Sequence, residues 1–254
     1  MKSVIIGAGN VATILGRKIL EAGHEIMQVT SRDAGRARIL GDKLSCLSNN
    51  DFKNISKKGE LYLVAISDYA IQELHKKLQI DHAVVVHTAG SVALNALKKV
   101  SVNCGVLYPL QSLRMEMTVI PEFPVLVDGN TPETLTLIHD FAETISDNVQ
   151  HANDEQRLRL HLAAVVANNF TNHLFALTKE FCEKEKVDFE LLLPLIKETA
   201  NRLKHHSPDK LQTGPASRDD MNTVASHLEL LKDNEGLKKL YEAITESIRS
   251  NQMK

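Results

Sequence analysis

A glycine-containing turn near the start of the chain constrains the fold more than any other sequence feature. Gly7, Gly9 and Ala12 follow a short apolar run and open a segment with helical periodicity. Gly7 permits a tight turn, Gly9 lets a ligand approach the backbone, and the small Ala12 lets the helix lie close to a sheet. This context predicts a strand, a turn and a helix whose N-terminal N–H groups bind the pyrophosphate of a dinucleotide. A purely structural glycine turn is the alternative.

Up to residue 150, short apolar runs alternate with segments of helical periodicity. The predicted strands are 3–6, 25–30, 61–66, 83–87, 104–107 and 124–127, and the predicted helices are 11–22, 34–40, 70–78 and 132–145. This alternation is typical of a parallel sheet that helices cover on both faces. We therefore predict an α/β fold with a doubly wound, mostly parallel Rossmann sheet, and assign residues 1–150 to a dinucleotide-binding domain.

After residue 150 the sequence follows a helical period and lacks β-rich runs. The predicted helices are 154–186, 188–204, 218–232 and 235–250. The first would be roughly 50 Å long, a length that spans a domain or packs against a second subunit. We assign residues 151–254 to an all-helical domain for substrate binding and dimerisation.

Composition argues against several classes of function. The formal net charge is -2, from 30 Lys and Arg against 32 Asp and Glu, so the chain has no basic excess for nucleic acid. No apolar run approaches the roughly 20 residues that cross a bilayer. The three cysteines lie far apart and without a ligand-spaced histidine, which argues against a metal site or a disulfide framework. We expect a cytoplasmic protein without metal, nucleic-acid or membrane partners.

The residues after the second predicted strand discriminate between cofactors. An acidic side chain there accepts hydrogen bonds from a ribose 2′-OH, whereas an arginine accommodates a 2′-phosphate. Ser31 and Arg32 occupy this position, so we predict NADP(H) in preference to NAD(H), with Arg32 pairing with the phosphate and Ser31 hydrogen-bonding it. Asp33 is the counter-evidence, and an arginine in contact only with solvent is the alternative for Arg32.

Three polar loops follow later strands, at the edge where a doubly wound sheet binds its ligands. The candidate cofactor contacts there are Ser67, His87, Thr88 and Gly90, and the candidate substrate contacts are Ser91 and Tyr108. His87 or Tyr108 could exchange a proton with substrate. The structural alternative makes Gly90 part of a turn and Ser91 a helix cap.

The long predicted helix carries a polar stripe. At 100° per residue, Asp154, Arg157, His161, Asn168 and Asn172 fall within an arc of about 60°. His161 is the best candidate for a general acid or base because imidazole titrates near neutral pH. Asn168 could orient a substrate oxygen, with Asn172 one turn beyond. Alternatively, these side chains bridge helices within the domain or across a dimer.

The loop from Thr213 to Asp220 has a structural interpretation, with Ser217 as a helix N-cap and Asp220 at the third helical position. This interpretation does not explain Arg218, which could bind an anionic substrate or pair with an acidic neighbour, and we favour the acidic neighbour.

The combination of GAGNVA, LVAISD, HTAGS, LYPLQS, HLAAVVANNFTNHL and TGPASRDD resembles a family of Rossmann-like proteins with a helical C-terminal domain of unassigned function. That family is similar to pyrroline-5-carboxylate reductases, deazaflavin-dependent NADP reductases and β-hydroxyacid dehydrogenases, which implies an NADP-type cofactor and a homodimer. The resemblance implies cofactor positions at Gly7, Gly9, Asn10, Val11, Ser31 and Arg32, and cleft positions at His161 and Asn168. β-Hydroxyacid dehydrogenases carry a helix lysine followed four residues later by asparagine, and this chain lacks that lysine, so their mechanism does not transfer.

Two hypotheses follow. The first is an NADP(H)-dependent oxidoreductase that transfers a hydride to or from a small imine, 2-oxo acid or hydroxy acid. The second is a nucleotide-binding regulatory or scaffold protein that performs no turnover, since a fold alone does not establish chemistry.

Overall fold

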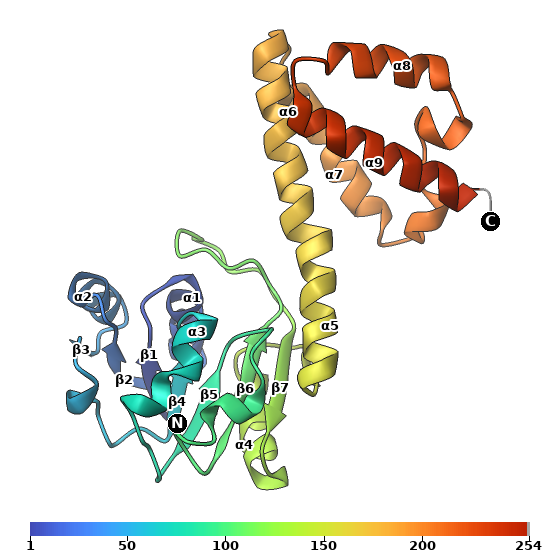
Figure 1. Ribbon diagram of the computed structural model, residues 1–254. Helices are drawn as coiled ribbons and strands as arrows, with labels where there is room; N and C mark the ends of the chain where they lie inside the picture. Colours follow the sequence, from blue (N-terminus) through green and yellow to red (C-terminus); the bar gives the residue numbers. More distant parts are fainter. Residues whose placement is uncertain (253–254) are drawn as a thin grey trace. The chain divides into compact units, whose positions relative to one another are not determined.

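The computed structural model describes residues 1–252 and divides into two compact units, Met1–Asn168 and Asn169–Lys254 (Figure 1). Unit 1 contains the sheet and the helices that cover it. The boundary between the units lies within the helical segment of residues 154–185. The first part of that segment, including His161, therefore belongs to the same unit as the sheet.

Unit 1 is built on an eight-stranded sheet in the order β3-β2-β1-β4-β5-β6-β7-β8. The strands are β1 (Lys2–Ile6), β2 (Glu25–Thr30), β3 (Leu47–Asn49), β4 (Leu61–Val64), β5 (Val84–His87), β6 (Cys104–Pro109), β7 (Val125–Gly129) and β8 (Val149–His151). All neighbours are parallel except β6 and β7, so the predicted mostly parallel Rossmann sheet is confirmed. The short edge strands β3 and β8 were not predicted because they contain no apolar run.

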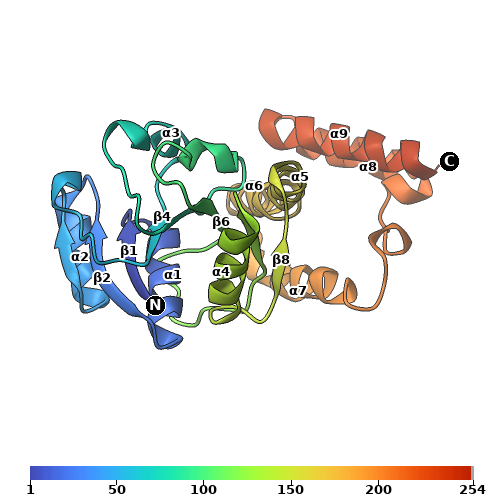
Figure 2. The same cartoon turned by 90° about the horizontal axis from the view of Figure 1, so that it is seen from below.

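Helices cover both faces of this sheet, as Figure 2 shows. On one face lie α1 (Asn10–Glu21), α2 (Ala34–Lys43) and α4 (Pro132–Glu143), and on the other lie α3 (Asp68–Gln72) and the 3₁₀ helix Leu94–Leu97. Alternation along β1 separates the two cores, because Ile5 packs with the first group while Val4 and Ile6 pack with the second. The parallel strands are therefore apolar on both sides and end together at one edge.

The predicted helix 154–186 is confirmed as one helical segment with an unpredicted interruption. It consists of α5 (Asp154–Ala164), a π-helical stretch (Val165–Phe170) and α6 (Thr171–Glu185). The π-helix bonds i to i+5, so its residues advance around the axis by less than 100°. The stripe predicted from an ideal α-helix therefore does not continue in register beyond Ala164.

The α-helices of unit 2, among the described residues, are α6, α7 (Leu193–Arg202), α8 (Met221–Leu230) and α9 (Glu235–Gln252). The predicted start of the third helical region is wrong. Asp220, and not Ser217, is the N-cap of α8, since its carboxylate accepts from the Thr223 N–H at 3.1 Å. Ser217 lies in a separate 3₁₀ helix (Ala216–Arg218), which is followed by Asp219 with a positive φ of 55°. In the part of the chain that the structure describes, no helix is long and apolar enough to cross a membrane.

Candidate functional site

A cleft of about 1140 Å³ lies at the carboxyl ends of the parallel strands in unit 1. The glycine turn after β1, the ends of β2 and β4, and the loop after β5 form its walls. Tyr108 near the end of β6 and His161 on α5 also line it. Four of the loops selected from the sequence therefore meet at one place, because parallel strands deliver their carboxyl ends to the same edge.

The two glycines of the turn have different structural roles. Gly7 has a φ of +123°, and a Cβ placed there would lie 2.1 Å from the Ala65 carbonyl oxygen. Gly9 has ordinary extended angles, and a Cβ built on it would meet no atom within 4 Å. Gly7 thus lets the chain pass close to β4, whereas Gly9 leaves open space in front of the α1 N-terminus. That open space fits a diphosphate held by main-chain N–H groups.

Asn10 and Val11 both line the cleft, and the side chain of Asn10 also has a structural partner. Its Oδ1 accepts from the Met115 N–H at 3.1 Å. Arg17, farther along α1, donates to the carbonyl oxygens of Met117 and Thr118. The segment between β6 and β7 is therefore held against α1.

Cationic side chains border the end of the cleft beside β2. Ser31 and Arg32 line it as the sequence indicated, and so does Arg36, which the sequence analysis did not select. Asp33 caps α2 by accepting from the Arg36 N–H at 3.0 Å, and its other oxygen lies 3.5 Å from Arg36 Nε. The carboxylate that argued for NAD(H) is thus engaged in capping and pairing. The guanidinium groups of Arg32 and Arg36 are exposed at this end of the cleft, and arginine is the side chain suited to binding a phosphate.

Tyr108 and His161 form a hydrogen-bonded pair on the cleft wall. The Tyr108 hydroxyl lies 3.0 Å from His161 Nδ1, and the two rings meet edge to face at a centroid distance of 5.9 Å. Burial raises the pKa of Tyr108, so its hydroxyl is protonated at neutral pH. Gly90 makes room for this pair, because a Cβ on it would lie 2.7 Å from His161 Cγ. The structure therefore joins two residues that the sequence selected independently.

His87 does not line this cleft. Its side chain is fully buried, and its Nδ1 accepts from the Ala89 N–H at 3.2 Å. Burial, with a smaller effect of the nearby Arg157 charge, lowers its pKa to about 4, so the imidazole is neutral at physiological pH. Thr88 lines the cleft, and its Oγ1 is 3.4 Å from the Val64 carbonyl oxygen. His87 thus stabilises the loop after β5 through its buried hydrogen bond with Ala89 and does not face the cleft.

The remaining predicted residues take separate positions. Ser67 lines the cleft as the residue before α3, while the Ser91 hydroxyl donates to Asp68. Asn168 lies exposed on the π-helical stretch and is not among the residues that line the cleft. The exposed residues Asn172 and Arg218 belong to unit 2. The cleft also includes Phe52, Tyr69, Leu74 and Lys77, which carried no motif that would have identified them.

Two family models match the chain. Residues 2–90 match the model described as NADP oxidoreductase coenzyme F420-dependent, and residues 123–248 match a domain of unknown function (DUF2520). None of the curated proteins matches the sequence.

Solved structures match the chain over nearly its whole length. A protein from Bacteroides fragilis, provisionally assigned as an NADP oxidoreductase, is 37% identical, with 98% of each chain covered and a TM-score of 0.93. Protein TM1727 from Thermotoga maritima is 24% identical, with 99% of this chain and 100% of that one covered and a TM-score of 0.80. The 1-pyrroline-5-carboxylate reductase of Streptococcus pyogenes shares the fold at 15% identity, with coverage of 99% and 98% and a TM-score of 0.66.

The glycine pair provides a matched test of the turn. We predict that Gly7→Ala lowers the free energy of unfolding by about 3 kcal/mol, because it adds an unfavourable φ to a backbone overlap. Gly9→Ala leaves that free energy within about 1 kcal/mol but weakens NADPH binding at least about tenfold, because the methyl group occupies the space of the diphosphate. Urea unfolding and the fluorescence of NADPH measure the two effects. Unchanged NADPH affinity in a folded Gly9→Ala variant would contradict the assignment.

Proposed function

This chain belongs to an NADP oxidoreductase family and carries a C-terminal region that matches a domain of unknown function, and from that membership we propose that it is an NADPH-dependent reductase of a small imine or carbonyl compound. The observation that carries the proposal is the Tyr108–His161 pair on the wall of the cleft that contains the glycine turn. A proton donor and a dinucleotide cradle in one cleft are what such a reduction requires.

The residues around the cleft divide the work of holding the cofactor. The open backbone at Gly9 and the N-terminus of α1 receive the diphosphate. Arg32 and Arg36 pair with the 2′-phosphate, which NADPH has and NADH lacks. Bound NADPH supplies the hydride.

Tyr108 and His161 supply the proton. The Tyr108 hydroxyl donates its proton to the substrate nitrogen or oxygen as the adjacent carbon receives the hydride, which reduces the C=N or C=O bond to a single bond. His161 then returns its Nδ1 proton to the Tyr108 oxygen along their 3.0 Å hydrogen bond, while its Nε2 takes up a proton from solvent so that the ring stays neutral. Solvent reaches this ring because the His161 side chain is partly exposed. Asn168 stays a candidate for orienting the substrate.

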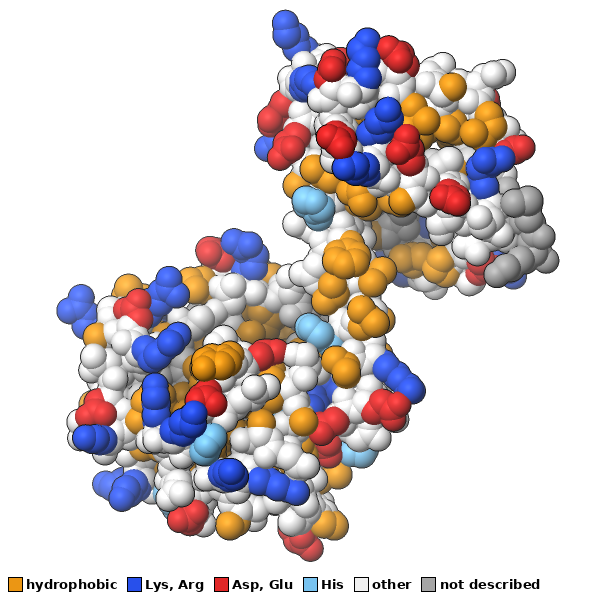
Figure 3. All heavy atoms as spheres, viewed as in Figure 1, with side chains coloured by type: hydrophobic (Ala, Val, Ile, Leu, Met, Phe, Trp, Pro, Cys, Tyr) orange, Lys and Arg blue, Asp and Glu red, His pale blue; other side chains and the backbone are white. Residues whose placement is uncertain are grey.

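We further propose that the protein is a homodimer through unit 2. The buried apolar residues of this unit, among those that the structure describes, are Cys182, Ala216, Val224 and Leu231. Its exposed large apolar residues are Phe170, Val187, Leu191, Leu195, Leu203, Met221, Leu230 and Ile244. Figure 3 shows hydrophobic side chains gathered on the visible face of the helical segment and of this unit. A unit with so small a core requires further burial of apolar side chains, and a second copy of the chain offers the same apolar surface for this contact.

We predict that Arg32→Ala and Arg36→Ala each weaken NADPH binding about 10- to 100-fold, because each removes a charge-assisted hydrogen bond. NADH binding changes less than about twofold, since NADH has no 2′-phosphate. Arg38→Ala, an exposed arginine on the same helix that does not line the cleft, is the matched control. The chain has no tryptophan, so cofactor fluorescence reports binding directly. Equal losses for the two cofactors would remove the assignment.

Turnover tests the reductase against the non-catalytic alternative. With NADPH and a panel of cyclic imines, 2-oxo acids and aldehydes, we expect oxidation of NADPH by at least one class. Tyr108→Phe and His161→Ala then lower kcat/KM about 100- to 10,000-fold, because each removes a proton-transfer group, while NADPH affinity is retained.

His82→Ala is the control for this experiment, because it removes another tyrosine–histidine contact of unit 1, between Tyr62 and His82, away from the cleft. Tight NADPH binding with no turnover across the panel would favour a regulatory or scaffold protein. Full activity of the His161→Ala variant would eliminate the proposed relay.

A further inference from the structure

Arg157 carries a buried positive charge that the proposed mechanism does not yet use. Its side chain is 1% exposed, the lowest exposure of any charged residue in the described core. One nitrogen, Nη2, donates to Asp154 Oδ1 at 2.6 Å and to the Val92 carbonyl oxygen at 2.5 Å. Nε and Nη1 have no hydrogen-bond partner among the described residues. A buried guanidinium with two unsatisfied nitrogens is costly, so packing alone does not explain the residue.

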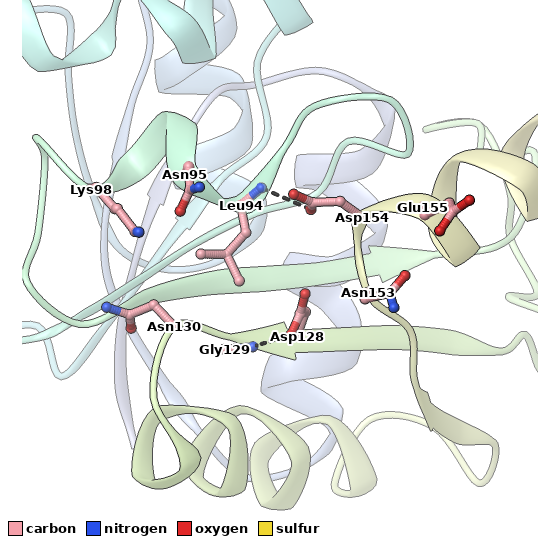
Figure 4. A pocket seen from close by; sticks show the side chains of 9 residues that line it. All are labelled: Leu94, Asn95, Lys98, Asp128, Gly129, Asn130, Asn153, Asp154 and Glu155. Carbon is pink, nitrogen blue, oxygen red and sulfur yellow. Dashed lines mark hydrogen bonds between the residues drawn. The ribbon is translucent and has the colours of Figure 1, made fainter.

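The partners of Arg157 connect α5 to the loop after β5. Asp154 Oδ1 also accepts from the Leu94 N–H at 3.0 Å, and Figure 4 marks this hydrogen bond with a dashed line. One carboxylate therefore holds both the loop and the guanidinium. Asn153 and Gln156 close a capping box at the same helix end. His161 follows Arg157 by four residues, one helical turn later, and packs on Gly90 of that same loop. The first turn of α5 is therefore fixed against the loop that His161 contacts.

The Arg157 charge also acts on Tyr108. Burial raises the pKa of Tyr108, while the positive charge of Arg157 opposes that increase. The same charge adds to the effect of burial in lowering the pKa of His87. The titratable and charged groups of the surrounding elements are His161, Arg157 and Asp154 on α5, His87 at the end of β5 and Asp68 at the start of α3. Of these, only Arg157 is a permanent cation.

We propose that Arg157 is a positioning residue for the Tyr108–His161 pair. It anchors the first turn of α5 to the loop after β5, and it holds a fixed positive charge one helical turn from the histidine that Tyr108 contacts. The role in catalysis rests on the proposed function, in which Tyr108 gives up its proton to the substrate. The oxygen left behind carries a negative charge in a partly buried place, and a nearby fixed cation reduces the cost of that charge.

Ionisation of Tyr108 in the free protein tests this role without cofactor or substrate. The chain has four tyrosines and no tryptophan, so NMR of ring-¹³C-labelled tyrosine follows four signals, and the spectrum of the Tyr108→Phe variant assigns the one from Tyr108. Arg157→Gln keeps hydrogen-bonding capacity without charge, and we expect it to raise the pKa of Tyr108. Arg157→Lys keeps the charge and leaves that pKa near the value in the unaltered protein. A purely structural role predicts that the Gln and Lys variants behave alike, which would overturn the proposal.

Two further variants complete the experiment. Arg159→Gln removes an exposed arginine on the same helix, which pairs with Glu155, and leaves the pKa of Tyr108 unchanged. Asp154→Asn keeps an oxygen acceptor but removes the negative charge that offsets Arg157, so we expect it to lower the pKa of Tyr108. This variant tests the proposal independently if Arg157→Gln is too unstable to titrate. A raised or unchanged pKa in Asp154→Asn would also overturn the proposal. Absence of turnover in the unaltered protein would instead defeat the proposed function and leave this ionisation result standing.

Discussion

The close passage of Gly7 against the Ala65 carbonyl is the constraint on which the rest of unit 1 depends. It allows β1 and β4 to lie side by side while the chain turns from β1 into α1 without a side chain in between. The helix N-terminus therefore points toward the edge where the parallel strands end. Without that turn, the loops after β2, β4 and β5 would not line one cleft with the N-terminus of α1.

A second set of interactions brings the Tyr108–His161 pair to this edge. The ion pair between Asp154 and the buried Arg157 attaches α5 to the loop after β5, and the missing side chain at Gly90 lets the His161 ring approach Tyr108. The cleft thus combines an open helix N-terminus with a tyrosine–histidine pair whose side chains can exchange protons. This combination, rather than the fold alone, supports a reductase over a passive nucleotide-binding protein.

The sequence was sufficient for the parts of the structure that follow periodic patterns or backbone geometry. The glycine turn, the central strands and the helical second half were predicted from spacing, and Tyr108 and His161 from their positions after a strand and on a helix. The sequence analysis did not select Arg36, because no sequence pattern shows that Asp33 caps α2 and that Arg36 lines the cleft. Asn168 was aligned with His161 on the assumption of an ideal α-helix, and the π-helical stretch changes that register. No sequence pattern shows that Arg157 is buried, because that follows from the packing of α5 on a distant loop.

The most direct test of the central claim is a crystal structure of the protein with NADP⁺. The account predicts that the diphosphate lies over Gly7 and Gly9, that the 2′-phosphate contacts Arg32 and Arg36, and that the nicotinamide ring faces the Tyr108 hydroxyl. A nicotinamide ring directed away from Tyr108 and His161, or a cofactor bound outside this cleft, would contradict the account.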